Sequence, residues 1–204
     1  MKIVYPASSI SGSDAVQKVY ESLILLQGFG LRLLDRQGND ADIRDVCDEI
    51  AINKERTFGF LAGTDRIRGE EMIDIIQSSM HAECDGKDHD DVLLVCVRGG
   101  YGCSRLLEWV DKEHKTSLWR LDGNEILLGY SDVTSLLWSR LASGINRCVH
   151  GPMLTEISRE PEWSKQRLRQ VLFKEPLPPL QGQSWSLGRA NGRLIVGCLV
   201  AVDG

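Results

Sequence analysis

The chain has 204 residues, a length that predicts one domain, with one domain plus the start of another as the alternative. Of its residues 42% are hydrophobic and 26% are charged, which is typical of a soluble globular protein. Its net charge of −5 and its lack of a lysine or arginine cluster argue against nucleic acid as a partner. Because no stretch approaches the roughly 18 apolar residues of a membrane span, we expect no membrane partner and a cytoplasmic location.

The first third of the chain predicts two strands and two helices. Residues 2–5 form the first expected strand, and residues 6–9 form a loop at its carboxyl end. A helix capped by Ser13 and Asp14 follows to about residue 27. Residues 31–34 predict a short second strand, and residues 65–80 predict a helix with an apolar side.

The middle of the chain alternates strands and helices. Residues 92–97 are nearly all apolar, as expected for a central parallel strand that is covered on both faces. Helices are predicted at 104–110 and 133–142, on either side of a second buried strand at 125–130. The fold class is therefore α/β, with a flavodoxin-like or Rossmann-like parallel sheet between helices and ligands at the carboxyl ends of the strands.

Prolines at positions 176, 178 and 179 interrupt regular structure. We therefore divide the chain into an α/β domain (1–172), a linker (173–190) and the start of an incomplete, β-rich second domain (191–204). Strands are expected at 184–187 and 193–202. The six cysteines are scattered and form no CxxC pair, which indicates reduced thiols and no metal site. No cofactor is expected.

A glycine turn with the sequence RGGYG, at residues 98–102, follows the buried strand and precedes a helix. Backbone amides in such a turn can bind an anion or an oxyanion. A tight turn without a ligand is the alternative. The spacing does not match the GxGxxG fingerprint of dinucleotide-binding proteins.

Ser131 is placed at the carboxyl end of a strand, immediately before a helix. This position presents a nucleophilic hydroxyl in many hydrolases, whereas a helix cap formed by Ser131 or Asp132 is the alternative. A nucleophilic serine also needs a base. Of the four histidines, only His150 is expected near this edge of the sheet, and for it a structural role is favoured over a catalytic one.

Four ordered blocks together resemble the serine LD-carboxypeptidase family, which includes muramoyltetrapeptide carboxypeptidases and microcin C immunity peptidases. The blocks are FLAGTD (60–65), RGGYG with SRLL (98–102 and 104–107), GYSDVT (129–134) and HGPM (150–153). This resemblance implies hydrolysis of the amide that joins an L-configured centre to a C-terminal D-amino acid. The typical reaction releases D-alanine from a cytoplasmic murein tetrapeptide during cell-wall recycling.

The resemblance implies a role for individual residues of this chain. Ser131 is the nucleophile, and the amides of Gly100 and Asp132 form the oxyanion hole. Gly99, Tyr101 and Arg105 bind the peptide substrate, although for Arg105 a surface position on a helix is the alternative. The family's glutamate and histidine lie further downstream than this chain extends, so we expect little activity from it. The resemblance also implies a homodimer.

Two other functions remain open from the sequence. A non-catalytic module could keep the peptide cleft without the chemistry, and binding of muropeptides would then occur without release of D-alanine. An anion-binding domain of flavodoxin-like type could instead use the turn at 99–102, which tight binding of a nucleotide or flavin would reveal.

Overall fold

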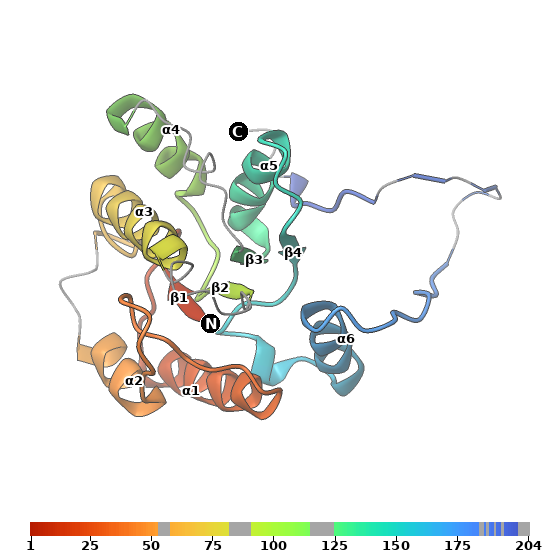
Figure 1. Cartoon of the computed structure of the whole chain (residues 1–204), viewed down its shortest axis with the longest axis horizontal. Helices are drawn as coiled ribbons and strands as arrows, with labels where there is room; N and C mark the ends of the chain where they lie inside the picture. The colour runs from red at the N-terminus through yellow and green to blue at the C-terminus, as the bar shows by residue number, and fades with distance from the viewer. Residues whose placement is uncertain are drawn as a thin grey trace.

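A parallel sheet forms the centre of the molecule (Figure 1). The computed structural model describes residues 1–52, 58–81, 91–114 and 125–183, together with 186, 188–189, 191–192 and 194–199. In these residues the strands are β1 (Lys2–Val4), β2 (Val92–Cys96), β3 (Glu125–Gly129) and β4 (Cys148–His150). They are hydrogen-bonded in the order β1-β2-β3-β4, and each neighbouring pair is parallel. The predicted α/β fold is confirmed.

Helices cover both faces of this sheet (Figure 1). On one face lie α1 (Ser13–Gly28), α2 (Ile43–Ile52) and α6 (Glu162–Leu172), and on the other lie α3 (Asp65–His81), α4 (Cys103–His114) and α5 (Thr134–Ala142). Two short 3-10 turns, η3 (Ser131–Val133) and η4 (Ile157–Arg159), complete the described elements. Alternate residues of β2 point to opposite faces, which explains why the whole strand is apolar.

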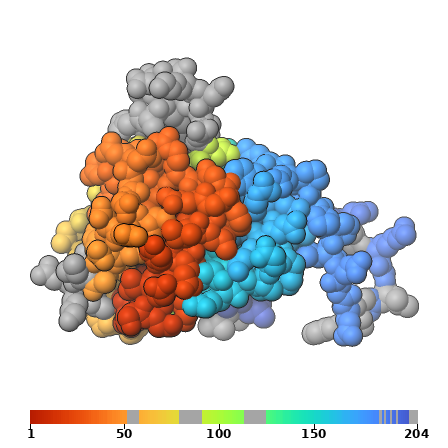
Figure 2. Space-filling view, turned by 90° about the horizontal axis from the view of Figure 1, so that it is seen from below, coloured from red at the N-terminus to blue at the C-terminus, as the bar shows by residue number. Residues whose placement is uncertain are grey.

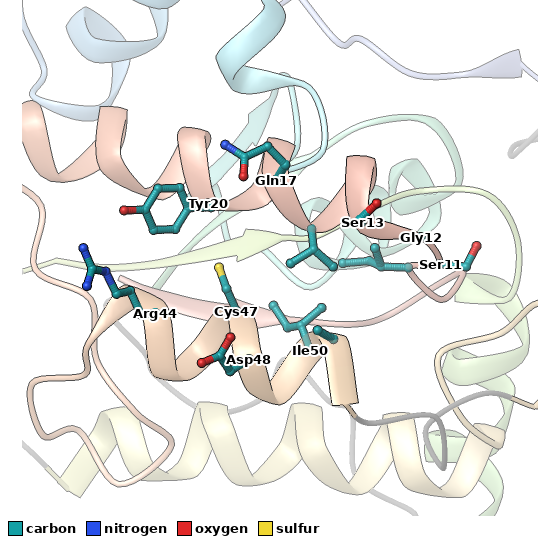
Figure 3. Close-up of a pocket in the computed structure, with 12 residues that line it drawn as sticks. Ser11, Gly12, Ser13, Gln17, Tyr20, Arg44, Cys47, Asp48 and Ile50 are labelled. Atoms are coloured by element: carbon teal, nitrogen blue, oxygen red, sulfur yellow. The ribbon is translucent and has the colours of Figure 1, made fainter.

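The face with α1 and α2 contains a cavity of about 640 Å³. Figure 2 looks onto this face and shows α6 beside α1, with the chain after α6 extending away from the body. The cavity lies between the start of α1 and one side of α2, and its lining is mixed in polarity (Figure 3). Helix α2 is absent from the sequence predictions. In the structure Asp42 accepts a hydrogen bond from the Arg44 amide at 2.7 Å and so caps the first turn of this helix.

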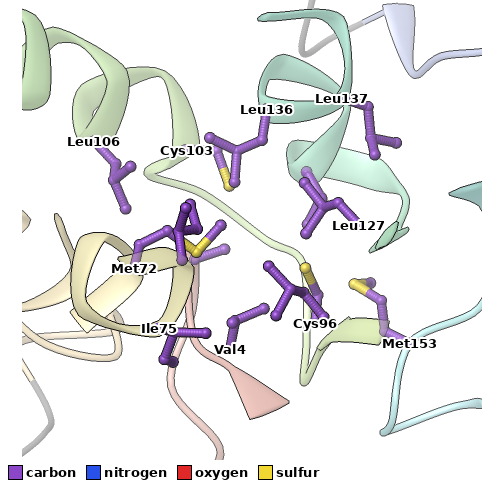
Figure 4. Close-up of a cluster of buried hydrophobic side chains, with 14 of the residues drawn as sticks. Val4, Met72, Ile75, Cys96, Cys103, Leu106, Leu127, Leu136, Leu137 and Met153 are labelled. Atoms are coloured by element: carbon purple, nitrogen blue, oxygen red, sulfur yellow. The ribbon is translucent and has the colours of Figure 1, made fainter. Parts of the chain in front are cut away.

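The opposite face holds a second apolar cluster, shown in Figure 4. Met72 of α3, Leu106 of α4 and Leu136 of α5 pack against side chains of the sheet such as Cys96 and Leu127. Each fully buried side chain of this size contributes about 1.5–3 kcal/mol relative to an exposed one. The cluster thereby fixes α4 and α5 over β2 and β3, whose carboxyl ends carry the turns described below.

Two local predictions near the N-terminus are wrong. Residues 31–34 form no strand of the sheet, because Leu34 makes only an isolated antiparallel bridge with Asp40. Their apolar character instead serves packing, as Leu33 is buried in the core. The N-cap of α1 is Gly12, and no side chain caps this helix. Asp14 forms an ion pair with Lys18 one turn later.

The segment after α6 has an irregular backbone. Residues 175–183 lie outside helices and strands, as the prolines predict, whereas the strand expected at 184–187 falls almost entirely outside the described residues. Within the strand predicted at 193–202, the described residues 194–199 pair with no strand, so this prediction is wrong for them. They lie against α5: Trp138 Nε1 donates to the Val196 carbonyl at 3.2 Å, and the Cys198 amide donates to Thr134 Oγ1 at 3.1 Å.

The division of the chain into domains stays a prediction. Among the helices that the structure describes, none combines the length and the apolarity needed to cross a membrane.

Candidate active site

Three turns meet at the carboxyl edge of the sheet. They follow β1 (residues 6–9), β2 (residues 98–102) and β3 (residues 130–132). The Ser8 amide donates to the Gly99 carbonyl at 3.3 Å, which joins the first two turns. The glycine turn after β2 and Ser131 after β3 both lie at this edge.

Ser131 lies against the glycine turn. A side-chain carbon built on Gly99 would lie 3.0 Å from Ser131 Cβ and 3.3 Å from Ser131 Oγ. Ser131 has a φ of 58°, and the preceding Tyr130 is extended. A positive φ is uncommon for a residue other than glycine and is concentrated at functional sites. Ser131 is half-buried, and its hydroxyl forms no hydrogen bond with another described residue.

Only glycine fits at position 100. Its φ is 119°, and a carbon built on it would overlap Ser8 Oγ and lie 2.8 Å from Ser8 Cβ. The backbone of the turn therefore approaches both serines closely because Gly99 and Gly100 have no Cβ atom. The sequence predicts only a loop at Ser8, and nothing in its local pattern indicates this contact.

Asp132 connects the same two turns through its side chain. Its Oδ2 accepts a hydrogen bond at 2.9 Å from the amide of Cys103, the first residue of α4. Neither Ser131 nor Asp132 forms a side-chain cap on η3 or α5, so the alternative of a local helix cap is wrong. The carboxylate instead satisfies a free amide at the start of α4 and fixes the end of the glycine turn beside η3.

A buried arginine supports the glycine turn from behind. The Arg68 side chain is fully buried, and its Nη1 donates to the carbonyls of Gly102, at 3.0 Å, and Pro6. Its Nη2 pairs with Asp65. The sequence predictions do not include Arg68 as a site residue. Its helical spacing from the apolar residues Met72 and Ile75 is the signal that identifies it.

The residues predicted to bind substrate have different surroundings. Arg105 is partly exposed, and its Nη2 pairs with Asp65 at 2.6 Å, so a carboxylate already occupies part of its guanidinium. Tyr101 is 50% exposed and makes an edge contact with Phe60, with ring centroids 5.9 Å apart. Both side chains come from residues close to the glycine turn in sequence, and their roles stay predictions.

Tyr130 connects the turn after β3 to a half-buried carboxylate, that of Glu156. Its hydroxyl donates to Glu156 Oε1 at 2.7 Å, and its ring meets that of His150 at 6.1 Å. Burial and the bond to Glu156 raise the pKa of Tyr130 to about 12, so it is neutral at physiological pH. Burial lowers the pKa of His150, which favours the neutral imidazole. The structure records no hydrogen bond from His150 to Ser131, and the structural role favoured for this histidine stays a prediction.

The described residues contain no group of three or more histidine, cysteine, aspartate or glutamate side chains that could hold a metal ion. Cys47, Cys96, Cys103, Cys148 and Cys198 are free thiols. The cavity between α1 and α2 in Figure 3 includes none of the residues predicted for the site. The sheet edge around Ser131 carries hydroxyl groups, backbone amides, carboxylates and guanidinium groups.

Comparisons with known proteins agree with this architecture. Residues 1–151 match the family model of the LD-carboxypeptidase N-terminal domain. A provisionally named carboxypeptidase of Synechocystis sp. is 44% identical over 143 residues, which are 70% of this chain and 42% of that protein. A similarly named protein of Streptomyces coelicolor is 31% identical over 163 residues, 78% of this chain and 48% of the relative. The chain thus spans less than half the length of these relatives.

Solved structures share the fold. Muramoyltetrapeptide carboxypeptidase from Oxalobacter formigenes aligns with a TM-score of 0.50 at 16% identity, over 84% of this chain and 48% of that one. The microcin C7 self immunity protein MccF in its wild-type apo state gives a TM-score of 0.54 at 17% identity, over 92% and 47%. An MccF-like protein from Bacillus anthracis gives 0.56 at 16% identity, over 84% and 43%.

Proposed function

This chain belongs to the LD-carboxypeptidase family, and on that premise we propose that Ser131 is the nucleophile of a serine carboxypeptidase reaction. The substrate we propose is a murein tetrapeptide, from which a C-terminal D-amino acid, typically D-alanine, is released during cell-wall recycling in the cytoplasm. The observation that carries the proposal is the positive φ of Ser131 beside Gly99. It places next to the glycine turn a hydroxyl that has no hydrogen-bond partner among the described residues.

The proposed reaction begins with attack of Ser131 Oγ on the carbonyl carbon of the last peptide bond. The negative charge that develops on the carbonyl oxygen would be stabilised by the amides of Gly100 and Asp132. The C–N bond then breaks, the D-amino acid leaves with a proton on its amine, and water hydrolyses the acyl-enzyme. The bond from the Cys103 amide to the Asp132 carboxylate supports this arrangement by holding the two turns together.

The general base of this reaction is not among the contacts of Ser131. No described residue forms a hydrogen bond with its hydroxyl, whereas a nucleophilic serine needs a base within hydrogen-bond reach. Where a serine hydrolase loses one member of its triad, a residual rate enhancement of about 10³–10⁴ over water remains from the oxyanion hole and substrate binding. We therefore expect slow turnover from the 204-residue chain.

Release of D-alanine from the tetrapeptide L-Ala-γ-D-Glu-meso-diaminopimelate-D-Ala tests the proposal. The wild-type chain should release D-alanine slowly, and Ser131→Ala should abolish the release. Ser143→Ala is the matched control, because the Ser143 hydroxyl is exposed and bonds to the Ser139 carbonyl within its own helix end. Equal rates from wild type and Ser131→Ala would rule out Ser131 as the nucleophile.

A non-catalytic muropeptide-binding module is the second candidate function. The observation that favours it is the lack of a base in contact with Ser131 among the described residues. Calorimetry separates the two functions: tight binding of the tetrapeptide without any Ser131-dependent release of D-alanine supports the binding module. Binding of a nucleotide or flavin in place of the peptide would favour an anion-binding domain.

A further inference from the structure

Two hydroxyl groups, those of Ser8 and Ser131, flank consecutive glycines of the turn. A side chain on Gly99 would lie next to Ser131 Oγ. A side chain on Gly100 would overlap Ser8 Oγ. Neither hydroxyl has a hydrogen-bond partner among the residues that the structure describes. Since adjacent Cα atoms are about 3.8 Å apart, the two groups face neighbouring points of the same short turn.

A guanidinium group from the glycine turn lies against the loop that carries Ser8. Arg98 is exposed, and its Nη1 donates to the Ser9 carbonyl at 3.4 Å, which brings the side chain across the residues that follow β1. In the described part of the chain Arg98 has no carboxylate partner, whereas Arg105 is paired with Asp65 at 2.6 Å. The remaining donors of Arg98 are therefore available for a carboxylate, whose geometry a guanidinium matches.

A carboxypeptidase has to recognise a free carboxylate one residue beyond the bond that it cleaves. That residue also spans about 3.8 Å, so the group that binds the carboxylate belongs about one residue away from the nucleophile. Resting on the proposed function, we propose that Ser8 and Arg98 bind the terminal carboxylate of the substrate. Ser8 donates through its hydroxyl, and Arg98, rather than the Arg105 expected from the sequence, supplies the positive charge.

A comparison of two ligands tests this assignment without turnover. Calorimetry on the full chain carrying Ser131→Ala measures the affinity for the murein tetrapeptide and for the same peptide with a C-terminal carboxamide. The carboxylate form should bind at least tenfold more tightly, which is the range of one hydrogen bond to a charged group. Ser8→Ala and Arg98→Gln should each reduce this preference severalfold, whereas Arg98→Lys should retain part of it.

Two substitutions serve as matched controls. The Ser9 hydroxyl lies in the same loop as Ser8 but bonds to the Phe60 carbonyl at 3.3 Å, so Ser9→Ala should leave the preference unchanged. Arg66 is exposed and paired with Glu70 at 3.0 Å, so Arg66→Gln should leave it unchanged as well. Thermal melts of all variants verify that each chain is folded.

The outcomes separate this proposal from the proposed function. If Arg105→Gln removes the preference for the carboxylate and Arg98→Gln retains it, or if Ser8→Ala binds like its parent, the assignment is overturned. Release of D-alanine that depends on Ser131 would still support the carboxypeptidase in that case. If neither peptide binds to the chain, both proposals fail, and equal binding of the two peptides overturns the carboxylate site alone.

Discussion

Replacing Arg68 with methionine should destabilise the protein through the turns that Arg68 connects. Methionine places an apolar side chain of similar length at this position of α3. The substitution removes the hydrogen-bond donors to Pro6 and Gly102 and the ion pair with Asp65. The losses are unequal. The Gly102 carbonyl still accepts a bond from the Leu106 amide at 3.0 Å, whereas the Pro6 carbonyl keeps only a weak contact with a thiol.

The size of the effect follows from these partners. Leaving the Pro6 carbonyl unpaired in the interior costs about 1–3 kcal/mol, and each of the other two bonds contributes about 1 kcal/mol. Loss of the ion pair between Arg68 and Asp65 is partly offset, because Asp65 still pairs with Arg105. Relief from burying a guanidinium offsets part of the sum. We expect a loss of about 3 kcal/mol in the free energy of unfolding, which corresponds to a melting temperature lower by roughly 6–12 °C in a chain of this size.

Urea unfolding followed by circular dichroism measures this loss, and the same helix provides the control. Arg66 carries an exposed ion pair with Glu70, so Arg66→Met should change stability by less than about 0.5 kcal/mol. A loss below about 1 kcal/mol in Arg68→Met would refute the reasoning, because it would mean that the carbonyls behind the glycine turn find other partners at little cost. Equal losses in both variants would refute it as well.

Three further predictions concern the site and its surroundings. Gly99→Ala should lower any activity that depends on Ser131 at least tenfold, because the added methyl would lie 3.0 Å from Ser131 Cβ and force that side chain to move. His150 should titrate below its ordinary value of 6.5 by NMR; its contribution to stability is then present above about pH 6.5 and is lost as the pH falls through the lowered native pKa. Thr134→Val should accelerate hydrogen exchange of the Cys198 amide, because it removes the acceptor of that bond.

Two of these predictions have a control in the same chain. Gly28 has open space where a side chain would lie and no positive φ, so Gly28→Ala should leave the same activity unchanged. In the exchange experiment the Leu106 amide, which donates within α4 to Gly102, should keep its protection in Thr134→Val. A native His150 titration at or above 6.5, or an unchanged Cys198 exchange rate, would contradict the corresponding prediction.

The sequence predicts those parts of the fold that depend on patterns along the chain. Continuous apolar runs reveal β2 and most of β3, because a strand covered on both faces has few polar positions; the exception is the buried Glu125 that begins β3. The same reasoning fails for residues 194–199, which are as apolar as a strand. A strand also needs a partner with free backbone groups, and here Trp138 and Thr134 of α5 supply hydrogen bonds instead. Composition indicates that a segment will be packed, but it does not indicate against which surface.

The residues of the candidate site also differ in whether the sequence predicts their contacts. Ser131 and Gly99 follow two strands whose carboxyl ends meet at one edge, so their proximity follows from the parallel topology and could be predicted. The contacts of Ser8 and Arg68 depend on how the loop after β1 and the helix α3 pack on the glycine turn, and each joins residues more than 30 positions apart. Arg68 occupies the apolar side of α3, where a charge is tolerated only with partners. A charged residue on the apolar side of a helix is therefore the signal that identifies such a support before a structure is known.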